Sequence, residues 1–115
     1  MNAVERLWRA LGARDWAGAE RQLHPQARIS WPHTGEEWAD AAAYVTAIRL
    51  NPGVPTVHVE RLLSDERNVS VLVRVEREDG ERRCAGFYLL QEGRIAGGTE
   101  LWVHSGAREV PPWRT

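Results

Sequence analysis

The stretch Asn68-Val-Ser-Val-Leu-Val-Arg-Val-Glu76 decides the fold of the second half of the chain. Valine occupies every second position from 69 to 75, and this period of two predicts a β-strand with one buried face. The segment Glu78-Asp-Gly-Glu81 follows, and its Asp-Gly pair is a strong signal for a tight hairpin. We therefore expect the chain to turn back at this point into a second, antiparallel strand.

Three strands are expected besides the valine strand. One precedes it, where Val57 and Val59 alternate with His58 and Glu60. The strand after the Asp-Gly turn spans residues 82–91. Glu92-Gly93 then turns the chain again, and a last strand spans residues 94–104. The parity of this last strand stays open because Gly97-Gly98 can hold a bulge.

The first half of the chain has the spacing of helices. Four apolar residues recur at i, i+3, i+4 and i+7, which predicts a first helix that Asn2 caps and Gly12 closes; they are Val4, Leu7, Trp8 and Leu11. Asp15 can cap a second helix in which Trp16, Ala19 and Leu23 share a face and which His24-Pro25 ends. Residues 27–31 then alternate as a short strand that Pro32 stops.

A third helix is expected from Asp40, its cap, to Leu50. Its inward residues are Ala41, Tyr44, Val45 and Ile48, and Asn51-Pro52-Gly53 is a stop signal. Helices followed by an antiparallel meander predict an α+β fold. We expect a cone-shaped, curved antiparallel sheet with the three helices packed on its concave face. The length of 115 residues fits one domain over residues 1–115.

The composition excludes several functional classes. All 15 basic residues other than histidine are arginine, so no lysine can form a Schiff base or bind a phosphate in a phosphate-binding loop. The net charge of −1 argues against nucleic acid as a partner, and no apolar run is long enough to cross a membrane. A lone cysteine, Cys84, excludes an internal disulfide and indicates a reduced, cytoplasmic protein.

Neither a metal site nor a cofactor is expected. The four histidines, His24, His33, His58 and His104, do not repeat at a metal-binding spacing such as H-x-x-x-H. The sequence also lacks a glycine-rich dinucleotide motif and a nucleophile elbow.

Several short segments carry a resemblance to a known family. The turn Glu92-Gly-Arg-Ile95 with Thr99-Glu-Leu-Trp102 resembles the last hairpin of SnoaL-like proteins, which belong to the nuclear transport factor 2-like superfamily of α+β cones. The openings Leu7-Trp-Arg-Ala-Leu11 and Arg14-Asp-Trp16, and the phrase Trp31-Pro32 before Gly35, are similar to the same family. The resemblance spans nearly the whole chain and implies a cone-shaped fold. Its members include cyclases, isomerases, dehydratases, epoxide hydrolases and binding modules, so it fixes no reaction.

One comparison within this fold suggests catalytic residues. Limonene epoxide hydrolases set an arginine between two aspartates, one of which activates water while the other protonates the epoxide oxygen. Here Arg74 and Glu76 share one face of a strand, and Glu100 lies on the last strand where such a hydrolase carries an acid. The resemblance therefore implies Glu100, Arg74 and Glu76 as catalytic candidates. The tyrosine and asparagine that also orient the water in those hydrolases have no clear match near Ile29 to Pro32.

Aromatic side chains suggest a ligand-binding end of the cone. Trp8 and Trp16 lie on inward helix faces and are expected in the core. The other candidates lie on or near the strands and the third helix that build the cone, where aromatic rings can form an apolar slot with a polar handle; they are Trp31, His33, Trp38, Tyr44, His58, Tyr88 and Trp102. Such a slot suits an apolar or ring-shaped small molecule.

The sequence leaves the facing of the valine strand open. If the valines pack under the helices, Arg74 is exposed or lies in a dimer interface; if they face a partner subunit, Arg74 points into the cone. We expect a homodimer through the sheet face, and Trp113 can cover an edge of its own or the neighbouring subunit. Three functions remain: a ligand-binding protein, a cofactor-free acid–base enzyme that uses Glu100 with Arg74, and a non-catalytic interaction or dimerisation module.

Overall fold

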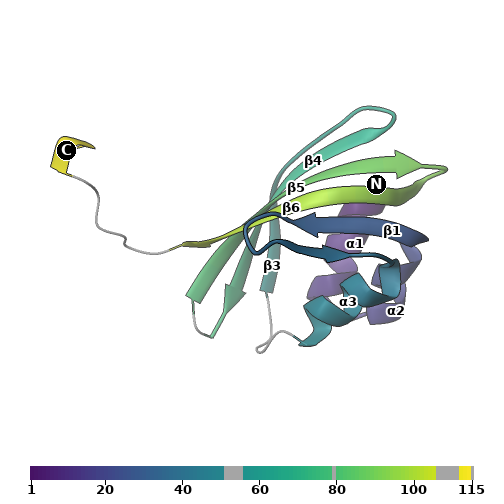
Figure 1. Cartoon of the computed structure of the whole chain (residues 1–115), viewed down its shortest axis with the longest axis horizontal. Coiled ribbons are helices and arrows are strands. Elements are labelled where there is room, and N and C mark those ends of the chain that lie inside the picture. Colours follow the sequence, from purple (N-terminus) through teal and green to yellow (C-terminus); the bar gives the residue numbers. More distant parts are fainter. Residues whose placement is uncertain (51–55, 79, 106–111, 115) are drawn as a thin grey trace.

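The computed structural model describes residues 1–50, 56–78, 80–105 and 112–114. These residues form three helices and a six-stranded sheet (Figure 1). The elements in chain order are α1 (Ala3–Gly12), α2 (Trp16–Arg21), β1 (Leu23–Trp31), β2 (Glu36–Trp38), α3 (Ala41–Leu50), β3 (Thr56–Ser64), β4 (Asn68–Arg77), β5 (Gly80–Gln91), β6 (Arg94–Ser105) and a short 3₁₀ turn at Pro112–Arg114.

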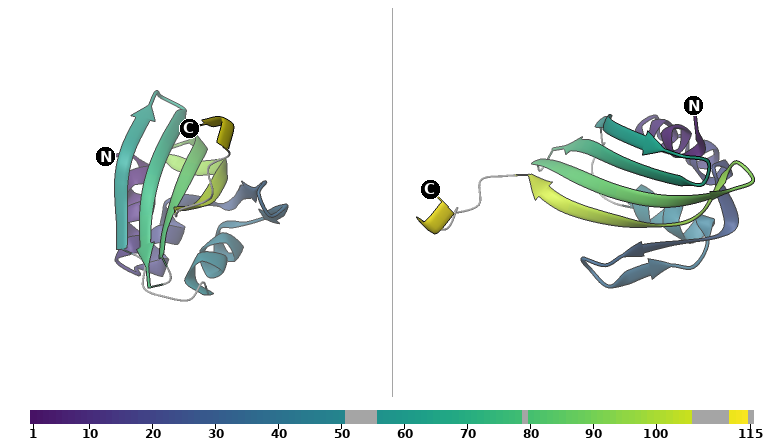
Figure 2. Two further views of the ribbon diagram at one scale, coloured as in Figure 1. Left: turned by 90° about the vertical axis from the view of Figure 1, so that its left-hand side faces the viewer. Right: turned by 90° about the horizontal axis from the view of Figure 1, so that it is seen from above.

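The predicted α+β fold is confirmed. The three helices lie on one side of a curved sheet whose strand order is β2-β1-β6-β5-β4-β3 (Figures 1 and 2). The sheet is mixed rather than wholly antiparallel, because β1 pairs with β6 in parallel while every other neighbouring pair is antiparallel. This pairing brings the N-terminal half of the chain beside its last strand.

The concave face, which the helices cover, is the face of the valines. Val69, Val73 and Val75 are almost completely buried together with Trp8 and Tyr44 from the helices. The open question of which face points into the cone is thereby answered. Residues that alternate with the valines lie on the convex face, which no described helix covers (Figure 1).

The predicted helix caps are confirmed. The side chains of Asn2, Asp15 and Asp40 each accept a hydrogen bond from a backbone N–H three residues on. In α3 the buried residues are those that the spacing predicted, and Tyr44 is among them. The cap at Asp40 therefore sets the position from which Tyr44 enters the core.

Two boundaries differ from the sequence-based expectation. The second helix ends at Arg21, and Leu23 lies in β1, where it pairs with Ile95 of β6 and is buried. His24-Pro25 does not end the helix but lies within β1, and the register of β1 on β6 shifts between Leu23 and Arg28. Proline has no N–H to donate to a strand ladder, which fits a position at this irregularity.

The last hairpin follows the expected turn chemistry. Glu92 and Gly93 both adopt positive φ, at 53° and 76°, as a two-residue hairpin turn of type I′ requires. The bulge in β6 falls at Ala96, next to the expected glycines, because Leu89 pairs with Gly97 while Leu90 pairs with Ile95. The stop signal at 51–53 and the turn residue Asp79 lie outside the described residues.

Within the described residues, no helix combines the length and the apolar character that a membrane span requires.

Candidate functional site

A single carboxyl group lies at the centre of the concave face. Glu100 of β6 is 0% exposed and is the one charged side chain among the buried residues that the structure describes. Its Oε1 accepts a hydrogen bond from the indole N–H of Trp31 at 2.9 Å. Its Oε2 accepts from the hydroxyls of Tyr44 at 2.7 Å and Tyr88 at 2.5 Å. Four elements, β1, α3, β5 and β6, therefore meet at one carboxylate.

The strand pairings explain how these groups meet. Ser30 of β1 pairs with Thr99 of β6 in parallel, so the next residues, Trp31 and Glu100, lie side by side on the concave face. Tyr88 approaches from β5, whose antiparallel register places Gly86 directly opposite Glu100.

Two glycines make room for the ring of Tyr88. A Cβ atom on Gly86 would lie 2.5 Å from the Tyr88 ring and hydroxyl, and one on Gly98 would lie 2.6 Å from the ring. Because neither residue carries a side chain, the ring of Tyr88 lies flat along the sheet and its hydroxyl reaches Glu100. Any larger residue at 86 or 98 would displace Tyr88 from this position.

Burial dominates the electrostatics of Glu100. Loss of solvent raises the pKa of Glu100 above its ordinary value, and the hydrogen bonds from Tyr88, Tyr44 and Trp31 lower it only in part. Burial, followed by the nearby charge of Glu100, raises the pKa of both tyrosine hydroxyls. No arginine or histidine of the described chain bonds to Glu100, so its charge has no basic partner.

Four tryptophans form a continuous cluster beside this acid. The ring centroids of Trp8 and Trp102 lie 5.8 Å apart, those of Trp102 and Trp31 6.3 Å, and those of Trp31 and Trp38 5.2 Å. The indole N–H groups of Trp8, Trp38 and Trp102 are buried and have no hydrogen-bond partner of good geometry in the described chain. The N–H of Trp102 still lowers the pKa of Glu100. Trp38 and Trp102 remain partly exposed, so this cluster connects the buried acid to the surface.

The structure brings together five of the residues that the sequence suggested as ligand-binding: Trp31, Trp38, Tyr44, Tyr88 and Trp102. His33 is exposed, with its ring centroid 6.1 Å from that of Trp31, at the rim of the group. Trp8, which was expected only as a core residue, is 1% exposed but also extends the tryptophan cluster through Trp102.

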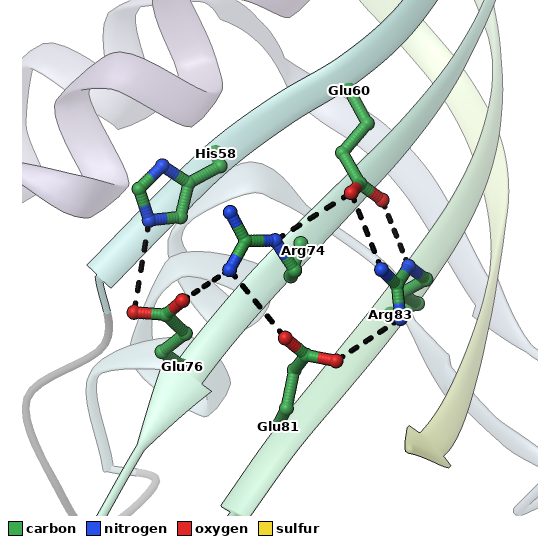
Figure 3. A network of polar contacts seen from close by, with 6 residues as sticks. All are labelled: His58, Glu60, Arg74, Glu76, Glu81 and Arg83. Carbon is green, nitrogen blue, oxygen red and sulfur yellow. Dashed lines mark hydrogen bonds and ion pairs between the residues drawn. The ribbon is translucent and has the colours of Figure 1, made fainter.

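Arg74, Glu76 and His58 lie elsewhere, on the convex face (Figure 3). Arg74 is one residue along from the buried Val73, so its side chain points away from Glu100. It forms ion pairs with Glu60 at 3.5 Å, with Glu81 at 3.4 Å and with Glu76. The expected pairing of Arg74 with Glu100 is therefore not formed.

The rest of this convex network connects Arg83 and His58 to the same glutamates. Arg83 pairs with Glu60 at 2.8 Å and with Glu81 at 3.1 Å, and His58 lies 3.7 Å from Glu76 (Figure 3). Hydrogen bonding to Arg83 lowers the pKa of Glu60. Within the described residues there is also no group of three His, Cys, Asp or Glu side chains that could hold a metal ion.

Sequence reasoning missed the supporting residues of the site. Gly98 was predicted only as part of a bulge at Gly97-Gly98, and Gly86 was not singled out. A glycine two residues before a strand tyrosine, as Gly86 is, places an empty position beside the ring on the same face. That spacing was the available signal.

Comparison with known proteins identifies relatives of this architecture. A family model described as a SnoaL-like domain matches residues 4–98. A candidate ketosteroid isomerase from Kribbella flavida is 25% identical with a TM-score of 0.86, over 96% of this chain and 80% of that one. An NTF-2 like protein of unknown function from Burkholderia xenovorans is 18% identical with a TM-score of 0.82, over 97% and 87%. An LEH-like epoxide hydrolase from M. tuberculosis is 16% identical with a TM-score of 0.70, over 88% and 80%. No functionally curated protein matches the sequence.

Titration of Glu100 should make stability depend on pH. Because burial raises the pKa of Glu100 above its ordinary value of 4.5, the folded protein keeps this proton at pH values where the unfolded chain has released it. The free energy of unfolding contributed by Glu100 therefore falls as pH rises from 4.5 through the folded pKa. Glu100→Gln cannot titrate and should lack this fall. Urea unfolding of both proteins at a series of pH values measures the difference, and equal slopes would contradict the assignment.

Proposed function

Because the chain belongs to the SnoaL-like domain family, we propose that it binds a small apolar, ring-shaped molecule at the aromatic end of its concave face. The observation that supports this most directly is the tryptophan cluster, in which the partly exposed rings of Trp38 and Trp102 flank Trp31 above a buried acid. Stacking on such rings is favourable for a flat apolar ligand, and the acid with its two tyrosines supplies the polar handle.

Binding of a neutral ring compound tests this function. A bicyclic probe such as 2-naphthol should raise the melting temperature and change the tryptophan fluorescence. Trp38→Ala should weaken binding about tenfold, since a stacked ring is lost. Trp16→Ala is the matched control, because Trp16 is also partly buried but lies in α2 and outside the cluster. Equal losses in both variants, or no binding of any ring compound to the wild type, would refute the proposal.

A second candidate is cofactor-free acid–base catalysis, and the shared hydrogen bonds of Glu100 with two tyrosines favour it. A carboxylate can move a proton beside a carbonyl group while a tyrosine O–H stabilises the oxygen that gains charge. The candidate ketosteroid isomerase from Kribbella flavida has the same fold. Isomerisation needs only these groups, whereas epoxide hydrolysis would also need an arginine, and Arg74 lies on the opposite face.

Turnover of an unsaturated ketosteroid separates the two candidates. If the chain is an isomerase, the conjugated ketone should accumulate faster with protein than with buffer. Glu100→Gln should then lower kcat at least about a hundredfold, as loss of a proton-transferring group does. Arg74→Gln should leave kcat unchanged because its side chain does not reach the acid. Equal rates for wild type and Glu100→Gln would remove the catalytic role of Glu100 and leave ligand binding.

A homodimer through the convex face completes the proposal. Large apolar side chains on this face are between 39% and 67% exposed, next to the ion-pair network of Arg74; they are Leu63, Phe87, Leu89, Leu101 and Val103. A contiguous exposed patch of this kind is typical of a protein interface.

The dimer is tested by placing a charge in the patch. Phe87→Glu should convert the dimer to a monomer in light scattering, because a carboxylate would lose its hydration in the interface. Leu50→Glu is the control, since Leu50 is 75% exposed but lies in the helical layer. A wild type that is monomeric at micromolar concentration, or a Phe87→Glu variant that stays dimeric, would contradict this interface.

A further inference from the structure

The sheet opens at the end where β1 begins, beside the β5–β6 hairpin (Figure 1). Leu23 of β1 pairs with Ile95 of β6, but the next pair along is Arg28 with Gly97. Four residues of β1, 24–27, therefore lie opposite a single residue of β6. The two backbones cannot stay in register over this stretch, so β1 arches away from β6 as a bulged strand does. The arch leaves hollows at this end of the molecule.

One of these hollows is a cavity of about 330 Å³ with apolar and charged lining residues. The apolar ones come from α2, β1 and α3, and they are Ala17, Leu23, Pro25 and Ala41. Leu23 and Ala41 are each 1% exposed, so they form a dry floor. The charged lining residues, Glu20, Arg21 and Arg94, are exposed and form the rim. We refer to this hollow as the arginine cavity.

One backbone hydrogen bond places the two arginines beside each other. The N–H of Ile95 donates to the carbonyl of Gln22 at 2.9 Å. Arg21 and Arg94 directly precede these two residues, so one arginine ends α2 and the other begins β6. Both side chains line the same cavity. Guanidinium groups from two elements can donate several N–H bonds to one oxyanion, such as a carboxylate or a phosphate.

Neutral groups fix the frame around this cavity. The Nε2–H of His24 donates to the backbone carbonyl of Gln91 at 2.7 Å, which joins the start of β1 to the end of β5. The side-chain amide of Gln22 donates to the carbonyl of Gly18 at 3.4 Å, within α2 and its cap. The arginines of the cavity are therefore not needed to hold its walls.

The rim of the arginine cavity carries excess positive charge. Arg21 and Arg94 contribute two positive charges and Glu20 one negative charge. In the part of the chain that the structure describes, Arg21 and Arg94 form no ion pair with an acid, whereas Arg74 and Arg83 on the convex face do. The cavity thus combines two available guanidinium groups with an apolar floor.

We propose that the arginine cavity binds a small organic anion, with a carboxylate or phosphate head on the two arginines and a compact apolar body on the floor. The site is separate from the proposed binding function, because Arg94 lies six residues along β6 from Glu100, about 20 Å at the ordinary rise of a strand. An anion would compensate the excess charge, and its body would cover Leu23 and Ala41.

Probes that share a ring and differ in charge test the inference. Benzoate and benzamide have nearly the same shape, but only benzoate is charged, and phenyl phosphate places the alternative head on the same ring. Calorimetric titration at low ionic strength should show benzoate or phenyl phosphate binding at least about tenfold more tightly than benzamide. The tighter of the two anions identifies the preferred head. Equal binding of all three probes, or binding of none, would overturn the inference.

Variants at the rim locate the site. Arg21→Gln and Arg94→Gln should each weaken anion binding about tenfold, because a charged donor is lost. Glu20→Gln should strengthen it severalfold, since a like charge beside the anion is removed. Arg9→Gln is the matched control, because Arg9 is an exposed arginine of α1 that does not line the cavity. All four residues are exposed, so these substitutions should leave the fold intact.

The outcomes are independent of the tryptophan cluster. Anion binding that survives in both Arg21→Gln and Arg94→Gln, or that falls equally in Arg9→Gln, would overturn the site. Trp38→Ala, which should weaken 2-naphthol binding, should leave benzoate binding unchanged, and an equal loss of both would place the anion at the cluster and overturn the inference. Absence of 2-naphthol binding alone would refute the proposed function and leave the arginine cavity standing.

Discussion

The buried carboxylate of Glu100 is the constraint on which the rest of the concave face depends. A charged group that leaves water loses several kcal/mol of hydration unless other groups replace it. Here two hydroxyls and one indole N–H replace it, and they come from α3, β5 and β1. Because no arginine takes part, the three neutral donors must all be present and aligned. The helical layer and both halves of the sheet are thereby fixed to one point.

Several features of the backbone follow from this demand. The parallel pairing of β1 with β6 is what brings Trp31 beside Glu100, and an antiparallel meander alone would not do so. Gly86 and Gly98 leave the space in which Tyr88 lies flat. Asp40 starts α3 at the position from which Tyr44 reaches the acid. Gly86, Gly98 and Asp40 do not bond to Glu100 themselves, but each positions a tyrosine whose hydroxyl does.

Local signals in the sequence predicted the elements better than their long-range contacts. The valine alternation, the caps at Asn2, Asp15 and Asp40 and the Glu92-Gly93 turn depend on neighbouring residues, and all were confirmed. The end of the second helix was wrong because pairing of Leu23 with Ile95, a contact across 72 positions, overrides helical spacing. The strand β2 has three residues and too little pattern to be recognised. Arg74 could not be assigned to a face, since alternation gives two faces without saying which one the helices cover.

The acidic side chains on the two faces of the sheet have different kinds of partner. On the convex face, two arginines lie among three glutamates and a histidine, so acids and bases largely compensate each other (Figure 3). On the concave side, Glu100 accepts hydrogen bonds from neutral donors, which are the indole of Trp31 and the hydroxyls of Tyr44 and Tyr88. The sequence has 15 arginines, yet no arginine in the described part of the chain bonds to Glu100. The same residue type therefore has a raised pKa at Glu100, where burial acts without an arginine nearby, and a lowered pKa at Glu60, where Arg83 donates a hydrogen bond.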